Sequence, residues 1–172
     1  MKVALVGSAN GWKDAPYDDM SWEIWSLNNI HNKIRTLPNG RWTRWFDIHE
    51  TAIDRPGNVE ALKKLGCPVY VRNERPDIPN SIVYPLEEMK REFFCNVNRK
   101  QFFTSSFPYM IALAIHEGCK ELSLYGIALA TNTEYAEQLP CVNFWLGIAL
   151  GKGIKVTVQK HSRVLNPETL YK

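Results

Sequence analysis

Short apolar runs recur along the chain, and each is followed by a turn or by an amphipathic segment. Continuous apolar character over so few residues is typical of strands that are buried on both faces, as in a parallel sheet. The runs that predict strands are Lys2–Val6, 23–27, 42–46, 68–71, 81–84 and 154–158. Glu121–Tyr125, which alternates apolar and polar residues as far as Leu124, predicts a further strand. Because parallel neighbours need a long crossover between them, we expect strands and helices to alternate along the chain.

Segments with a helical spacing of apolar residues lie between these runs. They cover residues 57–65, 86–94 and 142–150, and the stretch from the turn at Thr104 to Gly118. Residues 128–140 show no clear periodicity and predict a loop, and residues 161–172 predict a polar tail. The alternation predicts an α/β protein, with a single domain over residues 1–172, a three-layer Rossmann-like fold and a mostly parallel sheet.

The clearest helix start lies within residues 101–130. Thr104, Ser105 and Ser106 offer hydroxyls that can cap free backbone N–H groups. Pro108 suits a first helical turn, where its missing N–H costs nothing. A capped helix start also favours a phosphate or carboxylate, because the N–H groups and the helix dipole point at it. The same pattern fits a core helix without any ligand, and both interpretations stay open.

Small and polar residues follow several of the predicted strands. Gly7, Ser8 and Asn10 follow the first strand, Asn28 follows the second, and Gly126 ends the strand before the last. The carboxyl ends of parallel strands meet at one edge of a sheet, where α/β proteins bind ligands. Asparagine amides can donate to and accept from a sugar or a base. The alternative is a set of tight turns, which glycine and asparagine favour without a ligand.

Asp47 and His49 follow the third predicted strand. Residues two apart on an extended chain face the same side, so this carboxylate and imidazole could act as an acid/base pair. The other interpretation is a polar strand end exposed to water. In either case we expect Asp47 at the same edge of the sheet as Gly7, Asn28 and Gly126.

Composition narrows the class of protein. The 21 Lys and Arg against 18 Asp and Glu give a charge of +3, which is too small to indicate nucleic acid or a membrane surface. The cysteines, Cys67, Cys95, Cys119 and Cys141, lie too far apart for a zinc ribbon. The chain shows neither a signal peptide nor an apolar run of membrane length. We expect a reduced, cytoplasmic protein without a cofactor or metal, and formation of a homo-oligomer stays open.

Four segments, read in order, carry a family resemblance: VALVGSAN, IWSLNNIH, FFTSSFPYMIALAIHEGCKELSLYGIALA and GIKVTV. They resemble the Rossmann-like bacterial sialyltransferases of the Campylobacter type, and related glycosyltransferase-like proteins often found in phages. The resemblance implies a glycosyltransferase-like protein that binds a nucleotide or nucleotide sugar. The nucleotide contacts that it implies are Gly7, Ser8, Asn10 and Asn28. Ser105 and Ser106 then occupy the family's Thr-Ser-Gly turn.

The chain departs from that family at two points. Ala128 stands where related chains carry Asp at the end of a G-I-D strand, so a carboxylate is missing beside the expected ligand. The family's general base is a His that follows this strand, but residues 127–153 contain none, and His161 comes only after the last strand. Two function classes therefore stay open: a glycosyltransferase-like enzyme, and a non-catalytic binder that sequesters a nucleotide signal.

A second likeness rests on Glu134-Tyr135, FWLGIA and GKGIKV. These pieces resemble nucleoside deoxyribosyltransferase-like and TIR-like folds. That resemblance implies that Glu134 is a catalytic or ribose-binding carboxylate and that Tyr135 packs on the base. The alternative is a core helix, with Glu134 in a solvated loop.

Overall fold

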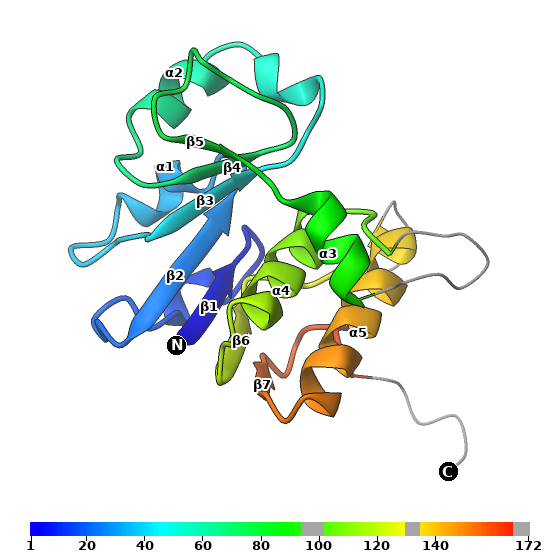
Figure 1. The fold of residues 1–172 in the computed structure, drawn as a ribbon. Helices are drawn as coiled ribbons and strands as arrows, with labels where there is room; N and C mark the ends of the chain where they lie inside the picture. Colours follow the sequence, from blue (N-terminus) through cyan, green and yellow to red (C-terminus); the bar gives the residue numbers. More distant parts are fainter. Residues whose placement is uncertain (94–101, 130–134, 167–172) are drawn as a thin grey trace.

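Seven parallel strands form one sheet in the computed structural model, which describes residues 1–93, 102–129 and 135–166 (Figure 1). The strands are β1 (Lys2–Val6), β2 (Trp22–Leu27), β3 (Arg44–Asp47), β4 (Val69–Val71), β5 (Ser81–Val83), β6 (Glu121–Tyr125) and β7 (Lys155–Val158). Their spatial order is β5-β4-β3-β2-β1-β6-β7, and each neighbouring pair runs parallel. The predicted α/β class and parallel sheet are confirmed.

The strand order reverses at β1. From β1 the sheet grows outward to β5, and the chain then crosses back to place β6 on the other side of β1. Val3, Ala4, Leu5 and Val6 have no exposed area, because neighbouring strands and helices enclose them. A reversal of this kind opens a crevice beyond the carboxyl ends of the two central strands. The topology thus fixes the place where a ligand site can form.

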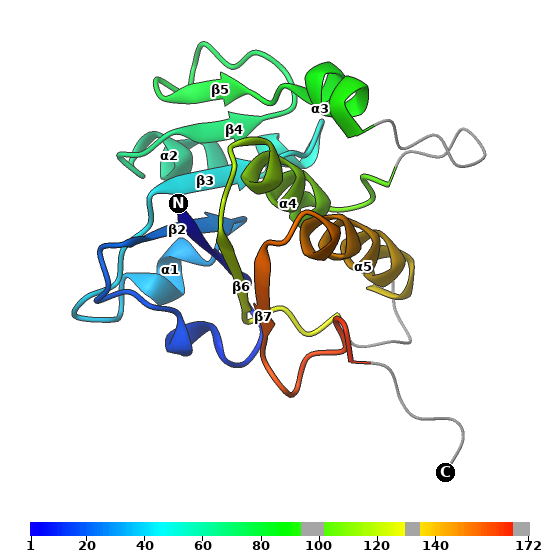
Figure 2. The ribbon, with the colours of Figure 1, turned by 60° about the horizontal axis from the view of Figure 1, so that its bottom comes forward.

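Helices cover both faces of the sheet (Figure 2). One face carries α3 (Leu86–Phe93), α4 (Ser106–His116) and α5 (Tyr135–Gly151), and the other carries α1 (His31–Ile34) and α2 (Asn58–Lys63). Side chains alternate along each strand, so Leu5 and Trp25 join the core under α4 and α5, while Ala4 joins the core under α1 and α2. These are the three layers that the sequence predicted.

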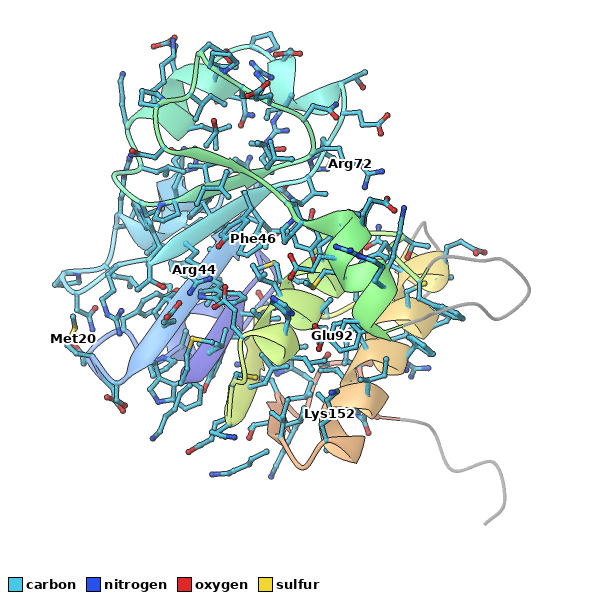
Figure 3. All side chains as sticks on the ribbon, viewed as in Figure 1. Met20, Arg44, Phe46, Arg72, Glu92 and Lys152 are labelled. Atoms are coloured by element: carbon cyan, nitrogen blue, oxygen red, sulfur yellow. The ribbon has the colours of Figure 1, made fainter. Side chains whose placement is uncertain are left out.

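The helix α4 brings its amino end to the crevice, and its carboxyl end is fixed by Arg44 of β3. The Arg44 guanidinium pairs with Glu117 at 2.6 Å and with Glu23 at 3.0 Å. It also lies 4.6 Å from the centre of the Trp25 ring. Figure 3 shows Arg44 on the face of the sheet that α4 covers. These contacts join β2 and β3 to the carboxyl end of α4 and so fix that end against the sheet.

Two predictions for the C-terminal third need correction. The loop predicted for residues 128–140 is partly wrong, because α5 begins at Tyr135 and continues through Pro140. The first turns of α5 carry exposed residues in place of a regular apolar stripe, so the sequence shows no helical spacing there. The polar tail is also partly wrong, since Ser162 and Val164 are buried after the turn that follows β7. Elsewhere the strand bounds agree with the predicted runs to within a residue or two.

Candidate functional site

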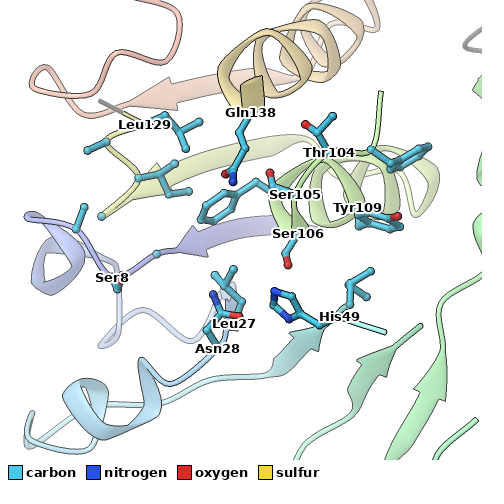
Figure 4. A pocket seen from close by; sticks show the side chains of 18 residues that line it. Ser8, Leu27, Asn28, His49, Thr104, Ser105, Ser106, Tyr109, Leu129 and Gln138 are labelled. Atoms are coloured by element: carbon cyan, nitrogen blue, oxygen red, sulfur yellow. The ribbon is translucent and has the colours of Figure 1, made fainter. Parts of the chain in front are cut away.

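A cavity of about 440 Å³ opens where the strand order reverses (Figure 4). It is lined by the residues that follow β1, β2, β3 and β6, and by the first turns of α4 and α5. Gly7, Ser8, Asn28 and Gly126, which the sequence placed at one sheet edge, all line it. The volume falls in the range of small-ligand sites, about 300–1,000 Å³.

The floor of the cavity is the crossing of the turns that follow β1 and β6. The Gly7 N–H donates to the Tyr125 carbonyl at 2.9 Å, and the Ala9 N–H donates to the Gly126 carbonyl at 2.8 Å. A Cβ atom on Gly7 would lie 2.6 Å from the Gly126 carbonyl oxygen, and Gly126 has a φ of 61°. Neither position has room for a side chain, so backbone atoms face the cavity there.

The segment after β7 fastens these turns from outside the cavity. The Gln159 side chain accepts a hydrogen bond from the Gly126 N–H at 2.9 Å and donates to the Gly11 carbonyl at 3.0 Å. The Ser162 hydroxyl donates to the Ile127 carbonyl at 2.5 Å. Gln159 therefore positions both turns, and Ser162, which lies in the predicted polar tail, positions the turn after β6. Their role arises only from tertiary contacts, and no local sequence pattern signals it.

Asn28 follows β2 in a left-handed backbone conformation, with a φ of 53°, which asparagine tolerates better than most residues. Its Oδ1 atom is buried and has no hydrogen-bond partner among the described residues. Asn28 therefore offers an unsatisfied acceptor to a ligand. At the turn after β1, the Lys33 ammonium donates to the Ser8 carbonyl at 2.9 Å and brings a positive charge to that turn.

The amino end of α4 forms another wall of the cavity. Ser105 is the N-cap residue, in an extended conformation, and makes no side-chain capping hydrogen bond, so the predicted capping is wrong at this position. Its Oγ atom is buried and finds no partner within the described ranges. The Thr104 hydroxyl reaches the Glu137 carbonyl of α5 at 3.5 Å instead. Ser105 and Ser106 both line the cavity.

Asp47 and His49 form a hydrogen-bonded pair at the end of β3, with His49 Nδ1 lying 2.8 Å from Asp47 Oδ1. The Asp47 side chain is wholly buried, and its Oδ2 accepts a hydrogen bond from Asn58 at 2.9 Å. Burial raises the pKa of Asp47, but hydrogen bonds from His49 and Asn58 outweigh it, so the pKa lies below its usual value. The interpretation of a water-exposed strand end is therefore wrong for Asp47.

The two members of this pair differ in their access to the cavity. The His49 side chain is 40% exposed and lines the cavity, whereas the Asp47 carboxylate does not reach it. Asp47 can thus act on a ligand only through His49. The sequence predicts this pairing, because residues two apart on a strand face the same side. The hydrogen bond from Asn58 to Asp47 can be seen only in the folded chain.

Ala128 and Leu129 line the cavity beyond the end of β6. Ala128 is partly exposed, and its carbonyl accepts a hydrogen bond from the Arg163 N–H at 3.1 Å. Leu129 has a φ of 44°, a left-handed conformation that is uncommon for a branched apolar residue. The position at which the sequence resemblance implies an Asp therefore opens toward the ligand space.

Besides Asp47, one further candidate residue of the described structure, Asn10, does not line this cavity. Asn10 is exposed, and its carbonyl accepts a hydrogen bond from His161 Nε2 at 3.0 Å. Glu134 and the side chain of Tyr135 lie outside the described residues. Their roles in a ribose or base site stay predictions.

Some lining residues were not expected from the sequence. Phe103 and Phe107 flank the serine turn, and Gln138 reaches the cavity from α5. The aromatic residues beside the serines were a usable signal, since bases often stack on such rings. Gln138 lies in a segment without periodicity, so the sequence gives no signal for it.

Among the described residues, no group of three or more His, Cys, Asp and Glu side chains is placed to hold a metal ion. Cys67, Cys119 and Cys141 are buried free thiols. In the same ranges, no helix has both the length and the apolar character needed to cross a membrane.

No family model matches the sequence, and no curated protein does. Solved structures do match. A point mutant of the α-2,3/8-sialyltransferase CstII superposes with a TM-score of 0.62 at 15% identity, over 96% of this chain and 84% of that one. The chain has the fold of this sialyltransferase.

Two more solved structures show the same fold. The sialyltransferase CstII from Campylobacter jejuni in complex with cytidine-5'-monophosphate (CMP) gives a TM-score of 0.60 at 16% identity, over 96% of this chain and 82% of that one. Its complex with CMP-3FNeuAc gives 0.60 at 15% identity, over 91% and 79%. The fold implied by the sequence resemblance is confirmed.

Proposed function

We propose that this chain is a glycosyltransferase-like protein that binds a nucleotide or nucleotide sugar in the cavity between β1 and β6. The observation that carries the proposal is a pair of buried polar atoms without partners among the described residues, Asn28 Oδ1 and Ser105 Oγ, on two residues that line the same cavity. Such atoms are rare in folded proteins, because each costs about 1–3 kcal/mol. A ligand rich in donors and acceptors would satisfy both.

The phosphate of such a ligand fits the amino end of α4. This helix has no acidic residue in its first turn, and its N-cap serine leaves the backbone N–H groups without a side-chain cap. Free N–H groups and the helix dipole together favour an anion. Lys33, beside Ser8, adds a positive charge on the side of the β1 loop. The ribose or base then lies toward Asn28.

The ligand class is supported by the fold. The sialyltransferase structures that share it include complexes with CMP and with CMP-3FNeuAc. The cavity here lies at the strand-order reversal, the position at which open α/β sheets bind their ligands.

A thermal-unfolding screen of nucleotides and nucleotide sugars tests the proposal. At a hundredfold excess over its Kd, a ligand that binds only the folded chain adds about 2.7 kcal/mol of stability. The wild-type chain and a Ser21→Ala control, which alters an exposed serine before β2, should respond alike. Ser105→Ala should respond less. A screen in which no nucleotide raises the unfolding temperature would contradict the proposal.

Ala128, which lies beyond the end of β6, favours a second candidate function, a non-catalytic binder of a nucleotide signal. Ala128 lines the cavity with a methyl group where related chains carry a carboxylate. Binding through Asn28 and the start of α4 does not require that carboxylate. Mass spectrometry of copurified molecules separates the two candidates: an intact, tightly held nucleotide supports the binder, and conversion of added nucleotide sugar supports the enzyme.

A further inference from the structure

We propose that His49 is the catalytic base of this site, and that Asp47 and Asn58 are positioning residues that hold it. The inference rests on the proposed binding of a nucleotide sugar. It places the base at the end of β3, rather than after β6, where the sequence resemblance would put it.

His49 differs from the other histidines of the chain in its surroundings. The chain has four histidines, and all of them lie in the described ranges. His31 is buried against Trp45, and His116 pairs with Glu92 on α3. His161 holds the Asn10 carbonyl. His49 alone of the four lines the cavity.

The surroundings of Asp47 determine which nitrogen of His49 carries the proton. Asp47 Oδ1 lies 2.8 Å from His49 Nδ1, so an ionised carboxylate at this distance requires an N–H there. Asn58 donates to Asp47 Oδ2 at 2.9 Å and also to the Ile53 carbonyl at 2.8 Å, which fixes its own orientation. With the proton on Nδ1, the neutral ring keeps Nε2 as an acceptor.

The charge at this position suits proton transfer. The hydrogen bonds from His49 and Asn58, with the Arg55 guanidinium 3.4 Å from Asp47 Oδ2, hold the pKa of the buried Asp47 carboxyl below its usual value. An imidazolium formed at His49 would therefore be paired at once with a negative charge. Carboxylates orient and stabilise catalytic histidines in the same manner in serine hydrolases.

The position of His49 also suits an incoming acceptor. In Figure 4 the His49 ring lies across from Ser106, at the amino end of α4 where the phosphate is proposed to bind. A hydroxyl group between the ring and the donor sugar would contact Nε2. The acceptor is thus an O–H group, either a sugar hydroxyl or water.

The transfer step is a displacement at the anomeric carbon of the donor sugar. His49 Nε2 takes the proton of the acceptor hydroxyl while the hydroxyl oxygen forms a bond to the anomeric carbon of the donor. The bond from that carbon to the phosphate oxygen breaks, and its electron pair leaves with the nucleotide. Asp47 stays ionised throughout and takes up no proton.

The first test reads the tautomer of His49 in the full chain saturated with CMP. Long-range proton–nitrogen NMR at a pH above neutral should show a neutral ring protonated at Nδ1. Asp47→Asn should remove this preference, because an amide can present either a donor or an acceptor to the ring. A wild-type ring protonated at Nε2 would overturn the proposal.

The second test measures release of nucleotide from CMP-, UDP- and GDP-sugars. His49→Gln should lower the rate about 10²–10⁴-fold, the usual contribution of general-base catalysis, with the Kd for CMP changed by only a few fold. His116→Gln is the matched control, since His116 lies outside the cavity, and it should keep the wild-type rate. Equal rates in wild type and His49→Gln would overturn the role of His49.

The outcomes separate this inference from the function on which it rests. A wild-type chain that binds CMP but turns over none of these donors overturns the catalytic role of His49, and leaves nucleotide binding standing. A chain that binds no nucleotide contradicts the proposed function itself.

Discussion

The substitution Gly126→Ala tests the crossing of the two turns that form the cavity floor. Gly126 has a φ of 61°, and an L-residue in that region costs about 1–2 kcal/mol. Its new Cβ would overlap the Gly7 carbonyl oxygen and lie 2.8 Å from Trp12 Cβ and 2.9 Å from the Ala9 carbonyl oxygen. Overpacking of this kind costs a further ~1–3 kcal/mol. The expected loss of unfolding free energy is therefore about 2–5 kcal/mol.

The matched control is Gly118→Ala, just after α4. Gly118 has a φ of 73°, but a Cβ atom there would meet nothing within 4 Å. It should lose only the backbone cost, about 1–2 kcal/mol.

Urea unfolding followed by tryptophan fluorescence measures both losses, since Trp25, Trp45 and Trp145 are fully buried and report on the cores. With an m-value of about 2 kcal/mol/M, the Gly126→Ala midpoint should fall by about 1–2.5 M, and that of Gly118→Ala by about 0.5–1 M. Equal losses in the two variants would refute the close approach of the β1 and β6 turns.

Three further predictions concern single side chains. Ser105→Ala should leave the free energy of unfolding of the ligand-free chain unchanged or raise it by up to ~1 kcal/mol, because an unpartnered buried hydroxyl is removed. A lower free energy of unfolding in urea would show that this hydroxyl is hydrogen-bonded in the absence of a ligand. The pKa of Asp47 is lowered, so its ionised form stabilises the fold. This stabilisation is complete above the usual carboxyl range and is lost as the pH falls below about 4. Between neutral and acid pH, the urea midpoint of Asp47→Asn should therefore fall less than that of the wild type. Ala128→Asp should lower the free energy of unfolding by less than ~2 kcal/mol, since the partly exposed methyl group opens into the cavity. It should also raise turnover if a carboxylate is the missing group. A loss of several kcal/mol in urea unfolding would show that position 128 is packed in the core.

The sequence predicted the sheet well: the central strands are apolar runs buried on both faces, and the partly exposed edge strands β5 and β7 keep short apolar or β-branched runs. It also predicted which residues meet at one edge, since parallel strands align their carboxyl ends. Gly7, Asn28 and Gly126 came together for that reason. The pairing of Asp47 with His49 followed from alternation along an extended chain.

The rest of the site depends on contacts between distant segments. Whether the Ser105 hydroxyl caps α4 depends on its surroundings as well as its residue type, and here it makes no capping hydrogen bond. Asn58 reaches Asp47 from α2, and Gln159 reaches Gly126 from beyond β7. Polar side chains of this kind carry no periodic signal, so only the folded chain shows what they contact.

Calorimetric titration of CMP into the wild-type chain, Ser105→Ala and Asn28→Gly tests nucleotide binding in the cavity directly. Glycine at position 28 keeps the left-handed backbone and removes only the amide. We expect one site per chain in the wild type, with each substitution weakening binding by about 1–3 kcal/mol, or roughly 5- to 150-fold. Absence of binding in the wild type, or equal affinity in all three proteins, would contradict nucleotide binding in this cavity.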